Sequence, residues 1–168
     1  YGHQSRMFAG FPQELVKKFG TDNLSYFHHV WTPDPAAFTS NPLLASNFSV
    51  VATAKDDKNS SYVVAIEGKK YPFYGTQFHP EKNPFEWHNA AEFPHSLDAV
   101  LTAQYYAYFF VNETRKNNHT FSNETAFLNA SIYKHVPYHF GVDPEFQQVY
   151  ILPNYNFTRK SGVKYNVP

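Results

Sequence analysis

The stretch YPFYGTQFHPEKNPFEW, residues 71–87, decides the fold that we predict for this chain. Its first half, up to residue 78, is apolar and rich in β-forming residues, as in a buried strand. Pro80 fixes its own φ and holds the preceding His79 in an extended conformation. His79 and Glu81 then project to the same side, with Cβ atoms about 7 Å apart. We therefore expect both at the end of a strand of an open sheet, where α/β folds place their chemistry.

A histidine beside a carboxylate is a candidate catalytic pair. The carboxylate can accept a hydrogen bond from one ring nitrogen and so fix the tautomer of the imidazole. The other ring nitrogen is then free to take a proton from a nucleophile. A His-Pro-Glu triplet is common, however, and a structural or surface histidine is the ordinary alternative, so the interpretation depends on the rest of the stretch.

The whole stretch through Asn-Pro-Phe-Glu-Trp resembles the γ-glutamyl hydrolase family, a branch of the class I glutamine amidotransferase-like superfamily. The Gln-x-His-Pro-Glu core marks only the superfamily, whereas its extension to residue 87 is more specific. Further matches lie from near the start of the chain to about position 151, so the resemblance covers most of the sequence. They are at residues 5–8, 110–113, 115–119, 146–148 and 150–151.

The resemblance implies an α/β fold: the C-terminal half of a three-layer α/β/α, flavodoxin-like domain. Its sheet would be mixed and mostly parallel, with an antiparallel hairpin. The resemblance also implies a hydrolase, an omega peptidase of the cysteine type, that cleaves γ-glutamyl bonds in folate poly-γ-glutamates or related γ-glutamyl peptides. In such an enzyme His79 and Glu81 would be the histidine and glutamate of a Cys-His-Glu triad.

Three further residues are predicted to bind the substrate. The family has a substrate-side histidine after a phenylalanine, and Phe27-His28 fits this pattern better than His29 does. A surface or packed histidine is the alternative for this position. Tyr74 and Trp87 are also expected at the substrate. For the aromatic loop that contains Trp87, the alternative is a loop pinned by buried rings.

The chain of 168 residues contains no cysteine. It therefore has no disulfide, no thiolate metal site and no thiol nucleophile of its own. By resemblance, the nucleophilic cysteine belongs to the N-terminal half of such an enzyme. We expect that half as a partner with a large apolar interface, and a homodimer of the full enzyme is a further expectation. The alternatives are a catalytically inactive relative that acts as a structural or binding subunit, and the glutaminase subunit of an amidotransferase.

Composition excludes several classes of function. The formal net charge is zero, which gives no indication of a nucleic acid or an anionic membrane as partner. No run of eighteen apolar residues is present, so no membrane span is predicted. The nine histidines lack metal-ligand spacing, and we expect neither a metal nor a cofactor.

Asn-x-Ser/Thr triplets indicate the compartment. The sequence contains eight such triplets, whereas about two would be expected by chance in this composition. This excess predicts a glycoprotein of the secretory pathway with a lysosomal, vacuolar or extracellular location. The glutaminase alternative is disfavoured on this ground, since a cytosolic enzyme does not need such sites. Asn112 falls near the core edge of a predicted helix and is the least favourable site. The predicted glycosylation sites are Asn23, Asn47, Asn59, Asn118, Asn123, Asn129 and Asn156.

Residues 1–152 are predicted as the enzyme-like domain, and residues 153–168 as a polar tail. Strands are expected at 24–31, 48–55, 62–67, 73–78 and 146–152, the second and third forming a hairpin, and residues 137–144 as a loop. Helices are expected at 13–19, 96–116 and 124–133. On the longest helix one apolar stripe is predicted to pack on the sheet. Its members are Leu97, Val100, Leu101, Gln104, Tyr108 and Val111.

Overall fold

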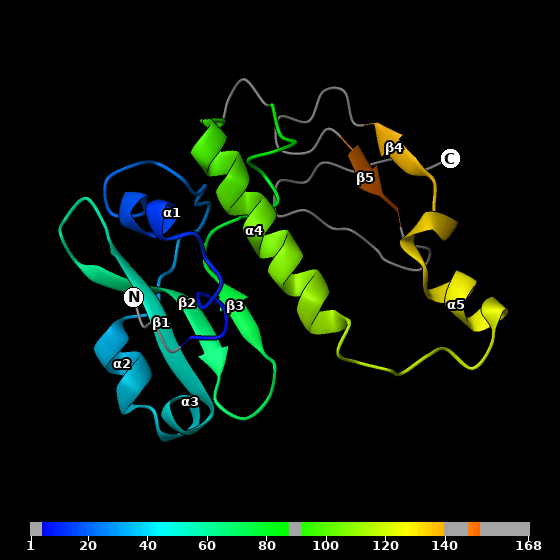
Figure 1. Ribbon diagram of the computed structural model, residues 1–168, viewed down its shortest axis with the longest axis horizontal. Coiled ribbons are helices and arrows are strands. Elements are labelled where there is room, and N and C mark those ends of the chain that lie inside the picture. Colours follow the sequence, from blue (N-terminus) through cyan, green and yellow to red (C-terminus); the bar gives the residue numbers. More distant parts are fainter. Residues whose placement is uncertain (1–4, 88–91, 140–147, 152–168) are drawn as a thin grey trace, which may run out of the picture. The chain divides into compact units, whose positions relative to one another are not determined.

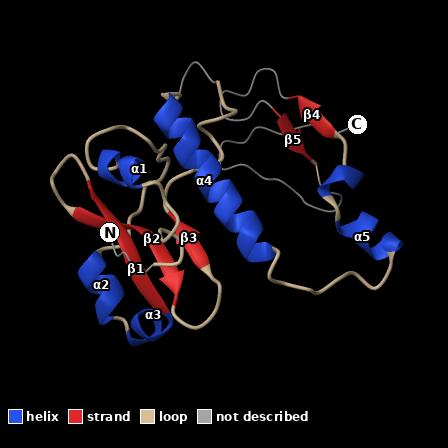
Figure 2. Ribbon diagram, viewed as in Figure 1, coloured by secondary structure: helices blue, strands red, loops and turns tan. Residues whose placement is uncertain are grey.

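The computed structural model describes residues 5–87, 92–139 and 148–151 (Figure 1). The chain divides into two compact units, Tyr1–Asn118 and His119–Pro168. Figure 2 shows that the first unit combines helices with a sheet. This mixture agrees with the predicted α/β class. The predicted tail lies outside the described residues.

The predicted hairpin is present in the first unit. Strand β1 (Phe48–Lys55) pairs antiparallel with β2 (Ser61–Gly68), from Phe48↔Gly68 to Lys55↔Ser61. The Asp56 carboxylate closes the turn by accepting hydrogen bonds from the backbone N–H groups of Lys58 (2.9 Å) and Ser60 (2.8 Å). Asn59 adopts φ 63°, which asparagine tolerates better than most residues. The polar turn thus sets the register of the two strands.

Strand β3 carries the chain to the His-Pro-Glu motif. It spans Tyr74–Thr76, pairs antiparallel with β2 and forms an edge of the β1-β2-β3 sheet. One more backbone bond, from the N–H of Gln77 to the carbonyl of Val64 (2.8 Å), extends the contact. The strand predicted at 73–78 is therefore in place but shorter. All pairings among the described strands are antiparallel, so these strands include no part of the predicted parallel sheet.

The core lies between the sheet and the helices of the first unit. Helix α1 (Gln13–Lys18) starts after Pro12 and covers this core with Leu15. Helices α2 (Pro35–Ser40) and α3 (Pro42–Asn47) have Asp34 and Asn41 as N-caps. Buried apolar side chains of the core include Met7, Phe8, Phe11, Leu15, Ala52, Val64, Ala65, Phe78 and Tyr106.

The apolar stripe predicted for the long helix is wrong. Helix α4 (Leu97–Thr114) begins as predicted, because the Ser96 hydroxyl accepts the N–H of Ala99. Its buried face, however, is formed by small residues and one aromatic ring: Ala99, Thr102, Ala103 and Tyr106. Short side chains let the helix approach the core closely, and the Tyr106 ring fills the remaining space. Five members of the predicted stripe are exposed instead: Gln104 and the apolar residues Leu97 (72%), Leu101 (41%), Tyr108 (69%) and Val111 (41%).

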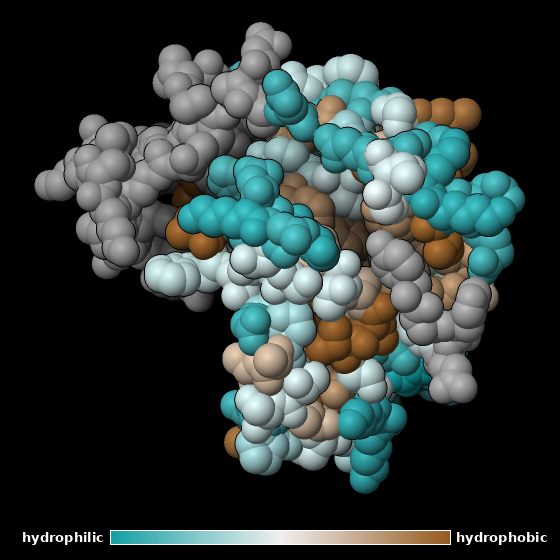
Figure 3. Space-filling model, turned by 90° about the vertical axis from the view of Figure 1, so that its left-hand side faces the viewer, coloured by the Kyte–Doolittle hydropathy of each residue, from teal (hydrophilic) through white to brown (hydrophobic). Residues whose placement is uncertain are grey.

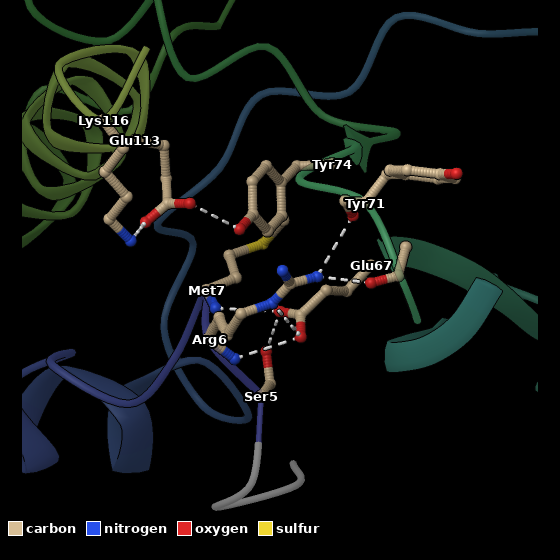
Figure 4. A network of polar contacts seen from close by, with 9 residues as sticks. Ser5, Arg6, Met7, Glu67, Tyr71, Tyr74, Glu113 and Lys116 are labelled. Carbon is tan, nitrogen blue, oxygen red and sulfur yellow. Dashed lines mark hydrogen bonds and ion pairs between the residues drawn. The ribbon is translucent and has the colours of Figure 1, made fainter. Parts of the chain in front are cut away.

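A buried carboxylate ties residues 5–7 to β2, as Figure 4 shows. Glu67 accepts hydrogen bonds from the Ser5 hydroxyl (2.9 Å), the Met7 N–H (2.9 Å), and the N–H and Nε of Arg6 (both 3.2 Å). Burial opposes ionisation of this carboxyl, but the four donors outweigh burial and lower its pKa. The charged network fixes the start of the chain against the sheet.

The second unit is described by itself. Helix α5 (Glu124–Ala130) is shorter than the helix predicted at 124–133; it is capped by Asn123 and followed by the 3-10 turn η1 (Ile132–Lys134). Strands β4 (Pro137–His139) and β5 (Gln148–Tyr150) pair antiparallel. The last strand was predicted, whereas β4 begins in a stretch predicted as a loop. Among the described residues, no helix combines the length and apolar character needed to cross a bilayer.

Candidate active site

His79 and Glu81 form the predicted pair. Nδ1 of His79 lies 2.9 Å from Oε1 of Glu81. The extended backbone predicted for this motif is wrong: Pro80 and Glu81 lie in a turn, in which the N–H of Lys82 donates to the carbonyl of His79 (3.3 Å). Pro80, with its fixed φ, restricts the backbone of this turn, in which the two side chains meet. A carboxylate only accepts hydrogen bonds, so Nδ1 is the protonated nitrogen and Nε2 carries the lone pair. The His79 side chain is 39% exposed and that of Glu81 62% exposed, so a reacting group from solvent can reach the pair.

The segment before α2 runs beside the motif. The N–H of His79 donates to the carbonyl of Tyr26 (2.9 Å), and the Gln77 amide donates to the carbonyl of Trp31 (3.0 Å). Residues 23–29 form no helix or strand, so the strand predicted at 24–31 is wrong. Its contacts with the motif are single hydrogen bonds rather than a ladder. They still suffice to place Tyr26 and its neighbours at the His79–Glu81 pair.

His28, rather than His29, lies on the side of His79. The ring of Tyr26 contacts both His28 (centroids 6.1 Å) and His79 (6.2 Å). His29 packs instead against Tyr62 on β2 (5.7 Å), and its Nε2 is buried. The two neighbouring histidines thus have different surroundings, and His28 belongs to the same ring cluster as His79. Its role toward the substrate stays a prediction.

The loop after the motif is held by Asn83, which is 1% exposed. Its side-chain amide donates to the carbonyls of Leu24 (2.9 Å) and Ala99 (3.4 Å), which links the loop to two other segments. Nδ1 of His95 donates to the carbonyl of Asn83 (2.8 Å), and the His95 ring stacks on Trp87 at 3.7 Å. Sequence reasoning missed Asn83 and His95, because no local pattern marks a polar residue that is buried by distant segments.

Trp87 has an exposed face. Trp87 is 70% exposed and the nearby Phe85 is 81% exposed, so these two rings do not pin the loop. The buried Asn83 and the Phe93 ring, which packs against Tyr26 (4.4 Å), hold it instead. The stacked pair of Trp87 and His95 offers an aromatic surface to solvent. Binding of the substrate to Trp87 stays a prediction.

Tyr74 is engaged elsewhere. Its hydroxyl donates to Glu113 on α4 (2.8 Å), its ring packs edge-on against Phe109, and Arg6 lies over it (Figure 4). Burial and the Glu113 carboxylate raise the pKa of Tyr74 to about 12. The hydrogen bond from Lys116, together with that from Tyr74, lowers the pKa of Glu113. These contacts fasten α4 to β3, and none of them joins Tyr74 to the residues around His79.

The described sequons are all on the surface. Asn112, expected near the core edge of its helix, is exposed as well, because the buried face of α4 is not the predicted one. Asn156 lies outside the described residues. Glycosylation at these positions stays a prediction. The exposed predicted sites are Asn23, Asn47, Asn59, Asn118, Asn123 and Asn129.

Comparison with known proteins adds the family. Residues 2–97, more than half of the chain, match the family "Glutamine amidotransferase class-I". The chain is 44% identical over 148 residues to gamma-glutamyl hydrolase of Homo sapiens, covering 88% of this chain and 46% of that protein. It is 34% identical over 149 residues to gamma-glutamyl hydrolase B of Dictyostelium discoideum (89% and 43%). It is 38% identical over 147 residues to gamma-glutamyl hydrolase 1 of Arabidopsis thaliana (87% and 42%).

The chain spans about half the length of the curated relatives it matches. The matched region includes the His-Pro-Glu motif, the segment beside it and the loop held by Asn83. On sequence and on the arrangement of these elements, the chain belongs to the class I glutamine amidotransferase family, and the relatives that match it along most of its length are gamma-glutamyl hydrolases.

Proposed function

We propose that this chain supplies the histidine and glutamate of a cysteine hydrolase that cleaves γ-glutamyl bonds. The contact between His79 and Glu81 carries the proposal, because it presents a free Nε2 at an exposed position beside the sheet. The similarity to gamma-glutamyl hydrolases supports γ-glutamyl bonds as the substrate class. The substrates that we propose are folate poly-γ-glutamates or related γ-glutamyl peptides.

The proposed chemistry follows from the tautomer of His79. Nε2 takes the proton of a cysteine thiol, and the thiolate attacks the γ-carbonyl carbon of the substrate. The tetrahedral intermediate collapses as His79 returns the proton to the leaving amine, which departs and leaves a γ-glutamyl thioester. His79 then takes a proton from water, which attacks the thioester carbonyl; the acyl part leaves with a free γ-carboxylate, and His79 returns the proton to the cysteine sulfur. Glu81 orients the imidazole and stabilises its protonated form.

The cysteine must come from outside these 168 residues, which contain none. We propose the N-terminal segment of the same protein as its source, since the relatives are about twice as long. Two surfaces support a docking role for that segment: the free edge of β3 and the exposed apolar side of α4. On a different face, the left-hand side of Figure 1, Figure 3 likewise shows apolar side chains that reach the surface between polar ones.

We also propose passage through the secretory pathway. Six predicted glycosylation sites within the described residues are exposed, as attachment of a glycan requires. A lysosomal, vacuolar or extracellular address would follow. Treatment of the protein from its native source with a peptide N-glycosidase should lower its mass, and an unchanged mass would contradict the assignment.

A γ-glutamyl hydrolysis assay tests the proposed activity. We expect the full-length protein, which carries residues 1–168 with the preceding segment, to release glutamate from a γ-glutamyl peptide and not from its α-linked isomer. The chain of 168 residues alone should give no turnover, because it lacks the nucleophile. Absence of turnover by the full-length protein would favour the alternative, a catalytically inactive relative that serves as a structural or binding subunit.

A further inference from the structure

Tyr26 lies between the two histidines of the site. Its ring stacks on that of His28, which lies two residues later in a segment without helix or strand. The Tyr26 hydroxyl is 3.3 Å from Nδ1 of His28, and the two rings are nearly parallel, at 12°. The Tyr26 ring also neighbours His79 (centroids 6.2 Å apart) and Phe93 (4.4 Å). One side chain thus lies next to both imidazoles.

The two histidines have partners of opposite hydrogen-bonding character. Glu81 can only accept, so it requires a proton on Nδ1 of His79. The phenol of Tyr26 can donate, and a neutral imidazole nitrogen is a more basic acceptor than a phenol oxygen. Nδ1 of His28 therefore accepts, and its proton lies on Nε2. Nε2 is then an acceptor on His79 and a donor on His28.

Resting on the function proposed above, we propose that Tyr26 is a positioning residue that holds His28 in the tautomer with its proton on Nε2. In this form the Nε2–H of His28 can donate a hydrogen bond to an oxygen of the bound γ-glutamyl group. The α-carboxylate of that group is the best acceptor, because it is charged. His79, held in the other tautomer, remains the base. Because of Tyr26, two chemically identical side chains have different roles: His28 binds the substrate and His79 transfers the proton.

The substitution Tyr26→Phe tests the link, because it removes the hydroxyl and keeps the ring. The backbone bond from His79 to the carbonyl of residue 26 is independent of the side chain. In the full-length protein, loss of one hydrogen bond should raise KM for a γ-glutamyl peptide by about 2- to 10-fold and leave kcat nearly unchanged. Tyr133→Phe, at a position that is 91% exposed in the second unit, is the matched control and should change neither constant.

A second readout does not depend on activity. Imidazole ¹⁵N shifts of the labelled full-length protein, assigned with a His28→Gln variant, report which ring nitrogen of His28 carries the proton. We expect the Nε2-protonated form in the wild type and a mixture of both tautomers in Tyr26→Phe. Unchanged ¹⁵N shifts of His28 in that variant would overturn the proposal. So would an unchanged KM in an active enzyme.

The two readouts separate this proposal from the proposed function. If the wild-type full-length protein does not hydrolyse γ-glutamyl bonds, the proposed function fails. The ¹⁵N shifts would still decide whether Tyr26 sets the tautomer of His28.

Discussion

Replacing His79 with alanine in the full-length protein is expected to lower kcat for γ-glutamyl hydrolysis by at least about 10³-fold. The variant lacks the base that takes the thiol proton and the acid that protonates the leaving amine. KM should change little, because binding is assigned to other residues. Steady-state kinetics with a γ-glutamyl peptide measures both constants.

His29→Ala is the matched control for this substitution. His29 packs against Tyr62, away from the ring cluster that joins His28 to His79. Its loss should leave kcat within a few-fold of the wild type. Equal activity of His79→Ala and the wild type would show that the His79–Glu81 pair is structural. A loss in His29→Ala as large as that in His79→Ala would point to unfolding rather than to chemistry.

Glu67→Gln is expected to lower the free energy of unfolding at pH 7 by about 2–4 kcal/mol. The carboxylate of Glu67 accepts four hydrogen bonds from residues 5–7 and is only 8% exposed. An amide at this position replaces one acceptor oxygen with a donor, which then faces donors. Urea unfolding of the full-length protein, followed by fluorescence, gives the difference between variant and wild type.

The effect of Glu67 depends on pH in a defined direction. Its pKa is lower in the folded protein than in the unfolded chain, where the pKa of a glutamate is about 4.3. The stabilisation is therefore complete above the unfolded pKa and is lost as the pH falls through the folded pKa. The difference between wild type and Glu67→Gln should shrink below about pH 4. Glu14→Gln, at an exposed position on α1, should show no such difference, and a constant difference for Glu67 across this range would contradict the account.

Local signals explain which parts of the fold could be predicted. The polar turn at Asp56 gives the hairpin, Pro12 starts α1, and Ser96 starts α4; each is a contact between residues close in sequence. The His79–Glu81 pair is also local, since Pro80 restricts the backbone between them. For each of these features, both residues of the decisive interaction lie within one short stretch of the sequence.

Long-range packing explains the rest. The buried face of α4 is set by the aromatic cluster on which Tyr106 packs, and the spacing of apolar residues along the helix does not reveal it. Asn83 is buried because Leu24 and Ala99 supply the carbonyls for its amide. The hydroxyl of Tyr74 donates to Glu113, which lies 39 residues later in the chain, rather than to a residue of the site. None of these partners could be identified from the neighbouring sequence.

The most direct test of the central claim is the pH dependence of cysteine alkylation in the full-length protein. If His79 serves the nucleophile, the thiol of the wild type should be alkylated by iodoacetamide well below the pH at which a free cysteine reacts, near its pKa of about 8.5. In His79→Ala the midpoint of the alkylation rate should shift upward toward that value. Identical profiles for the wild type and His79→Ala would contradict the claim that His79 acts on a cysteine supplied from outside this chain.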